Sequence, residues 1–284
     1  MNRRKALEYA GLGFGSIVSA SLGKSTFLTS LSLANSSGKQ TVESKIRSSE
    51  ADPEQWKYLP IDPLETAENA YQLYSEGSCM YAAFRSIVEA VGKKWLETDP
   101  QLAEIYLKFP FFMMKYGKGG VRDFGSLCGI LNGCAATIGL FVHSTDVQTE
   151  MISELFYYYE HENLPIYQPQ SSPFSSLPQT DAQSVLCHIS ATRWSKIADY
   201  EINSPQKKER CKRLTCDLVL KTIKLLDRYF ASLSDEIKCV FRSTPDEETS
   251  NCLKCHSDSG DQKDVTAQMN CSNCHYDLTD EHPQ

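Results

Sequence analysis

Two Cys-x-x-Cys-His motifs lie close together near the end of this 284-residue chain, at residues 252–256 and 271–275. The segment that contains them, from residue 243 onward, consists mostly of Asp, Glu, Ser, Thr, Asn and Lys. A segment of this composition has too few apolar residues to form a hydrophobic core of its own. It therefore needs a bound group to organise it, and the motifs indicate which group.

Two kinds of cofactor fit the spacing of these motifs. Two Cys-x-x-Cys pairs with fifteen residues between them are typical of a zinc ribbon, in which four thiolates surround one Zn²⁺. Cys-x-x-Cys-His is also the attachment motif of a c-type haem, with two thioethers and a proximal histidine. Only 6 of the 284 residues are His, so a histidine directly after both pairs favours haem. We predict two haems c, attached to Cys252, Cys255, Cys271 and Cys274 and coordinated by His256 and His275.

The N-terminus resembles an export signal. Arg3 and Arg4 precede a weakly apolar run rich in Gly, Ala and Ser, as in twin-arginine signals. The alternative is an amphipathic helix that begins with two arginines. We predict a signal peptide at 1–34, a polar linker at 35–54 and a periplasmic location. Export agrees with haem c, which bacteria attach outside the cytoplasmic membrane.

Composition limits the partners of the exported protein. The formal net charge is −7, and removal of the basic signal makes it more negative, which argues against nucleic acid and anionic lipid. After the signal, no stretch of eighteen or more residues is continuously apolar, so we expect no membrane span. Redox partner proteins are the expected partners.

The remaining body, 55–242, is expected to be helical, because helical periodicity is common in it and strand-like alternation is scarce. We expect helices from Asp62, from Ser78, and over about 123–142, 146–162, 183–198 and 205–233. The predicted fold class is mainly α: a helical domain followed by a short, irregular dihaem-binding segment at 243–284.

Seven cysteines lie in the body: Cys79, Cys128, Cys134, Cys187, Cys211, Cys216 and Cys239. One interpretation is two or three disulfides with buried free thiols, as in many exported proteins. The other is that four of them hold an iron–sulfur cluster, which agrees with twin-arginine export of a folded, cofactor-loaded chain. Several cysteines fall at predicted helix starts, where thiolates are favoured.

At these cysteines the chain resembles a family of redox proteins named for a Cys, Gly-Cys-Ala-x-x-Gly, Cys, Cys pattern. With both haem motifs added, it resembles the split-Soret cytochromes c over nearly all of the mature chain. The central motif departs from the pattern, since either Cys128 or Cys134 can fill it, the latter with its final glycine one residue too late. We favour Cys128. The candidate cluster ligands are then Cys79, Cys128, Cys187 and Cys211.

The resemblance also implies a homodimer, two closely stacked haems per subunit and two histidines on each iron. Distal ligands must then come from His143, His161, His188 and His282, or from a methionine such as Met269. We favour His188, which follows a family cysteine, and place His143 second.

These observations predict a periplasmic dihaem cytochrome c that transfers single electrons, with an additional iron–sulfur centre. Two imidazoles on each iron leave no open position for a substrate, which favours an electron carrier over an enzyme. One alternative is a redox enzyme acting at the cysteine cluster or at an open haem. A second alternative is a zinc-ribbon binding module.

Overall fold

The computed structural model describes residues 56–235, 239–242, 245 and 247–275, all within the unit Ala51–Gln284. The predicted signal peptide and linker, 1–54, lie outside the described residues, as does His282. Helices, turns and loops make up the described part, and its only β structure is two isolated bridges. The predicted mainly α fold is confirmed.

Helix α1 (Pro63–Trp95) begins where the sequence predicts a helix start. The Asp62 side chain accepts a hydrogen bond from the Glu65 amide at 2.8 Å, and Pro63 occupies the first turn, where no amide is needed. Ser78 has φ 68° and ψ −166°, which kinks the helix. The two helices expected here are therefore one kinked helix, and Cys79 is the first residue after the kink.

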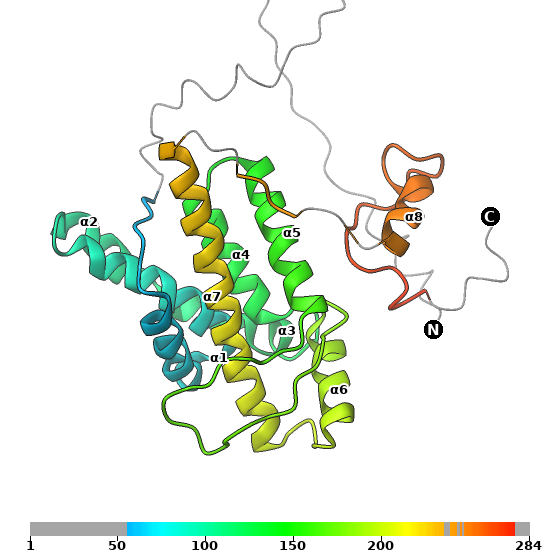
Figure 1. Ribbon diagram of the computed structural model, residues 1–284, viewed down its shortest axis with the longest axis horizontal. Coiled ribbons are helices and arrows are strands. Elements are labelled where there is room, and N and C mark those ends of the chain that lie inside the picture. The colour runs from blue at the N-terminus through cyan, green and yellow to red at the C-terminus, as the bar shows by residue number, and fades with distance from the viewer. Residues whose placement is uncertain (1–55, 236–238, 243–244, 246, 276–284) are drawn as a thin grey trace, which may run out of the picture. The chain divides into compact units, whose positions relative to one another are not determined.

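Four helices enclose the core (Figure 1). Helix α7 (Pro205–Asp235) packs along α1, and α4 (Gly129–Phe141) contacts both of them, while α5 (Thr145–His161) packs on α4 and α7. Fully buried aliphatic side chains from these helices fill the space between them, among them Ile87, Leu131, Ile138, Leu155 and Leu218. This bundle is the scaffold on which the cysteines are held.

The chain between α1 and α4 differs from the prediction. It forms α2 (Pro100–Leu107), the 3₁₀ helix η3 (Phe111–Gly117) and the short α3 (Lys118–Val121), none of which the sequence predicted. The helix expected over 123–142 begins only at Gly129, because several residues in 119–125 have positive φ and cannot continue a right-handed helix.

Two further boundaries matter for the site. Helix α6 (Cys187–Ala198) starts four residues later than expected, so that Cys187 is its first residue. The C-terminal segment, expected to be irregular, contains α8 (Glu247–His256), which carries the first haem motif. No helix in the described ranges is long and apolar enough to span a bilayer.

Candidate metal centre and haem sites

The four cysteines favoured from the sequence converge from α1, α4, α6 and α7. Burial raises the pKa of Cys79, and the nearby thiols of Cys128, Cys211 and Cys187 add to the increase by electrostatic repulsion. Tyr74, one and a half turns before Cys79 on α1, interacts electrostatically with the same four sulfurs. Residues far apart in the chain are thus brought together, with Cys128 among them, while Cys134 of α4 interacts electrostatically with Cys128.

Three of these cysteines lie at starts of helical segments. Cys128 is the N-cap of α4, Cys187 is the first residue of α6, and Cys79 follows the kink in α1. Cys211 lies in the second turn of α7. Helix N-termini carry partial positive charge, so three helix dipoles favour negative charge at this site.

Burial nevertheless favours the neutral thiol over the thiolate at Cys79, Cys128 and Cys187. It raises the pKa of Cys79 far above the ordinary value, raises that of Cys128, and raises that of Cys187 to about 12, and the neighbouring cysteines add to the increase. The expected gain from the helix N-termini is therefore outweighed by desolvation. Thiolates at this site require a compensating positive charge, such as that of bound iron.

The helices approach one another closely around Cys79. A Cβ atom on Gly129 would lie 2.6 Å from the Cys79 sulfur and closer still to the Gly117 carbonyl. The Cys79 thiol in turn lies 3.9 Å from that carbonyl. Glycine directly after Cys128 is thus needed for the first turn of α4 to pack on α1 and η3.

A short antiparallel pairing joins two of the cysteines. Segment 125–128 runs beside segment 185–188, with Leu127 and Leu186 paired. The Cys128 amide donates to the Val185 carbonyl at 2.8 Å, and the Cys187 amide donates to the Ser126 carbonyl at 2.7 Å. Backbone hydrogen bonds therefore fix the distance between the starts of α4 and α6.

His188 extends this pairing. Its amide and its Nδ1 both contact the Gly125 carbonyl, at 3.2 and 3.0 Å. A carbonyl oxygen only accepts hydrogen bonds, so Nδ1 carries the proton and Nε2 carries the lone pair. The ring is exposed, and a histidine held through Nδ1 by a carbonyl is a common arrangement for a metal ligand.

Arg210, directly before Cys211, is a charged residue of the site. It is only 2% exposed, its Nη2 donates to Ser190 Oγ at 2.9 Å, and its Nη1 lies 3.9 Å from Cys211 Sγ. Tyr159 of α5 donates to the same Ser190 oxygen at 2.8 Å. Sequence reasoning missed Tyr74, Tyr159 and Arg210; helical spacing from the buried Leu214 and Leu218 would have placed Arg210 on the buried face of α7.

The other body cysteines have different surroundings, although Cys134 interacts electrostatically with Cys128. Cys134 is buried in the middle of α4, and the Cys216 thiol contacts the Ala67 carbonyl of α1 at 3.2 Å. Among the described residues no disulfide is formed, and no three His, Cys, Asp or Glu side chains are close enough to ligate a single ion.

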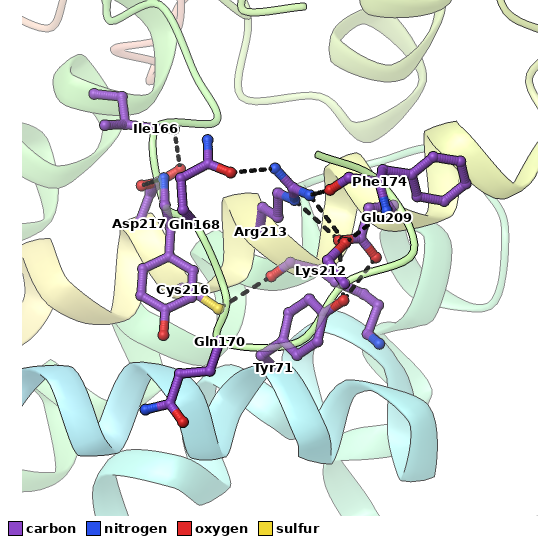
Figure 2. A network of polar contacts seen from close by, with 12 residues as sticks. Tyr71, Ile166, Gln168, Gln170, Phe174, Glu209, Lys212, Arg213, Cys216 and Asp217 are labelled. Atoms are coloured by element: carbon purple, nitrogen blue, oxygen red, sulfur yellow. Dashed lines mark hydrogen bonds and ion pairs between the residues drawn. The ribbon is translucent and has the colours of Figure 1, made fainter. Parts of the chain in front are cut away.

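A buried polar network fixes α7 beside the site (Figure 2). Arg213, 1% exposed, forms an ion pair with Glu209 at 2.9 Å and donates to Gln168 and to Ser172. Tyr71 of α1 donates to the same Glu209 carboxylate. These contacts connect α1, α7 and the loop that leads to Cys187.

The first haem motif lies on the last turns of α8. Cys252, Cys255 and His256 stand at positions i, i+3 and i+4, which share one helix face. Both thiols and the imidazole can therefore reach one porphyrin. His256 Nδ1 lies 2.8 Å from the Asp264 carboxylate, and Nε2 would be the nitrogen that holds a haem iron.

The second haem motif forms a single turn. The amides of Cys274 and His275 both donate to the Cys271 carbonyl, at 3.1 and 3.0 Å. This turn repeats the i, i+3, i+4 relation of the first motif. Cys274 and His275 are exposed.

A cavity of about 610 Å³ lies between α5 and residues 266–270. Ile152, Phe156 and Met269 give it an apolar lining. His161, the last residue of α5, lies at its wall with its ring tilted against that of Tyr157, 4.1 Å between ring centroids. The other distal candidate, His143, lies in the exposed turn between α4 and α5.

Comparison with known proteins identifies the family of the chain. Residues 102–225 match the family model described as "Putative redox-active protein (C_GCAxxG_C_C)". The split-Soret cytochrome c of Desulfovibrio desulfuricans is 36% identical over 228 residues, which cover 78% of this chain and 77% of the relative. A solved structure of that organism's protein, described for a novel iron centre, aligns with a TM-score of 0.69 and 34% identity over 80% of this chain and 95% of its own.

The range matched by the family model includes Cys128, Cys187 and Cys211. The alignment with the Desulfovibrio protein covers 228 residues and is therefore longer than this range. Sequence similarity and fold agree, and the chain belongs to the split-Soret cytochrome c family of redox proteins.

Proposed function

We propose that this chain is a periplasmic dihaem cytochrome c that transfers single electrons, and that an iron–sulfur centre bound by Cys79, Cys128, Cys187 and Cys211 exchanges electrons with the haems. Family membership supports the role in electron transfer. The observation that carries the iron–sulfur centre is the convergence of four thiols from four helices, two of them buried and two partly buried.

The cysteine arrangement suits a cluster better than a single ion. In an iron–sulfur cluster the four thiolates bind two or more irons, so their sulfurs lie farther apart than four ligands of one metal. This fits four thiols that influence one another without forming a single-ion site. The irons also supply the positive charge that these buried thiols need to ionise.

Metal analysis tests this centre. Anaerobically purified protein should contain more iron than haem, and Ser in place of any of the four cysteines should lower the non-haem iron while both haems remain. Cys134→Ser and Cys216→Ser are matched controls, because both thiols are buried but lie outside the site, and they should retain all iron. Equal iron and haem, with disulfides among the four cysteines, would contradict the proposal.

The haems are proposed to be covalently attached at the two motifs. Thioether bonds should keep the colour with the polypeptide through denaturation and acidified acetone, and Cys252→Ala or Cys271→Ala should each remove or weaken one haem. Complete extraction of the colour by acidified acetone would exclude c-type attachment, and a colourless protein with one zinc would favour the zinc-ribbon alternative.

His188 is proposed as a distal ligand. The contact of Nδ1 with the Gly125 carbonyl holds the ring and leaves Nε2 for iron. His188→Ala should make one haem high-spin and able to bind carbon monoxide, whereas His143→Ala, in an exposed turn, serves as the comparison. A His188→Ala protein with two fully low-spin haems would transfer the role to His143 or His161.

A homodimer is proposed as the working assembly. Phe112 of η3 and Phe124 after α3 are 72% and 85% exposed, and Met113 and Tyr116 add to the apolar surface. Large apolar side chains of this kind on a soluble protein often mark a contact surface. Light scattering should give twice the chain mass, and Phe124→Glu should lower it. A wild-type monomer at micromolar concentration would contradict the assembly.

A further inference from the structure

Arg210 is a buried charge beside the four-cysteine site. Only 2% of its surface is exposed. A guanidinium stays protonated in proteins, and the burial of a charge without compensation costs several kcal/mol. A nearby negative group is therefore required to keep Arg210 inside the fold.

No carboxylate pairs with Arg210 in the part of the chain that the structure describes. Its neighbour Glu209 forms an ion pair with Arg213 in the network of Figure 2. Asp217 interacts electrostatically with Arg210 but forms no ion pair with it, and its two oxygens accept backbone N–H groups from the loop before α6. The compensating charge must come from another source.

The contacts of Arg210 point to the cysteines. Its Nη1 lies 3.9 Å from Cys211 Sγ, and its charge interacts with both Cys211 and Cys128. Nη2 donates to Ser190, which fixes the plane of the guanidinium. Nε is buried and has no hydrogen-bond acceptor. A buried, unpaired donor on a cation beside four thiols indicates that a further acceptor belongs at this site.

We propose that Arg210 is the counter-charge of the iron–sulfur centre and that it raises the reduction potential of that centre. This role rests on the proposed function. Addition of one electron makes a thiolate-bound cluster one unit more negative, and a fixed cation stabilises that reduced state more than the oxidised one. The electron comes from a one-electron donor such as a ferrous haem, no bond forms or breaks, and Arg210 keeps its proton. Arg210 is thus a positioning and tuning residue, not a ligand.

Redox titration of the non-haem centre in the intact protein, followed by electron paramagnetic resonance, tests this role. Arg210→Met and Arg210→Gln remove the charge, whereas Arg210→Lys keeps it. We expect each neutral variant to lower the one-electron equilibrium constant for reduction about tenfold or more, which corresponds to about 59 mV. Arg210→Lys should stay within about threefold of wild type.

The matched control is Arg228→Met. Arg228 also lies on α7 and carries the same charge, but it pairs with Glu154, and its loss should leave the potential unchanged. If Arg210→Met does not fold, the comparison of Arg210→Gln with Arg210→Lys tests the role of the charge, because the Gln variant keeps polar groups for Ser190 without the charge. Loss of iron from both neutral variants, with retention in Arg210→Lys, would also support the role.

Two results would overturn it, and they are distinguishable. Equal potentials in Arg210→Gln, Arg210→Lys and wild type, with iron retained in all three, would exclude Arg210 as the counter-charge and leave the iron–sulfur centre in place. Wild-type protein without non-haem iron would overturn the proposed centre, and the role of Arg210 with it.

Discussion

Gly129→Ala should disrupt the metal centre through steric overlap alone. The added Cβ would lie 2.6 Å from the Cys79 sulfur, well inside the 3.4 Å at which ordinary van der Waals contact begins. It would also overlap the Gly117 carbonyl, which is backbone and cannot rotate away. Overpacking of this kind costs about 1–3 kcal/mol. Relief requires a shift of Cys79 or of η3, so the non-haem iron should fall as well.

Gly139→Ala provides the control on the same helix. Gly139 is exposed, and a Cβ there would meet no atom within 4 Å. Replacement of glycine by alanine in a helix interior stabilises by about 0.5–1 kcal/mol. The two variants make the same chemical change in α4 and should therefore shift stability in opposite directions.

Urea unfolding followed by far-ultraviolet circular dichroism measures the stabilities, and iron analysis measures the centre. The expected pattern is a lower urea midpoint with less non-haem iron for Gly129→Ala, and a higher midpoint with full iron for Gly139→Ala. A Gly129→Ala protein with wild-type stability and iron content would show that α4 does not approach Cys79 this closely, and the reasoning would fail.

Three further predictions concern residues around the site. Arg213→Met should lower the free energy of unfolding by about 3–5 kcal/mol, because Glu209 stays buried without its cation. The double variant with Glu209→Gln should lose less stability. A loss below about 1 kcal/mol for Arg213→Met, measured by urea unfolding, would contradict this prediction. Burial raises the pKa of Asp217 from 3.8 to about 6, so between these pH values the native state binds more protons than the unfolded state. The free energy of unfolding should therefore fall as pH rises through this range, by up to about 3 kcal/mol. A constant difference in stability between wild type and Asp217→Ala from about pH 4 to 7 would refute this prediction. Gly125→Ala should displace His188, because Gly125 has a φ of +74° and the added Cβ would lie 2.8 Å from the Cβ of His188. One haem should then become high-spin, and an unchanged visible spectrum would count against His188 as a ligand.

Local signals in the sequence were sufficient for most helices. Ser144 caps α5 and Pro205 opens α7, and both helices begin within a residue of the predicted positions. The break at Ser78 was also visible, although the chain continues through it as a kink. Short elements such as α2 and η3 were missed, because one or two turns carry too little periodicity to stand out.

The convergence of the cysteines was not readable from their spacing. Cys79, Cys128, Cys187 and Cys211 are separated by loops and whole helices, and only long-range packing brings them together. Family resemblance suggested the set, and the choice of Cys128 over Cys134 stays a prediction. Arg210 was overlooked because it stands in a run of charged residues on α7, where a single buried cation resembles its solvated neighbours.

The first turn of α6 places Cys187 and His188 on either side of a single peptide bond. Both backbone amides are held by the segment before α4, so neither residue can shift without the other. If one binds the cluster and the other a haem, a few covalent bonds separate the two ligand sets. This short covalent connection would provide a direct path for electron transfer. It would also keep the distance between the two redox centres constant while their charges change.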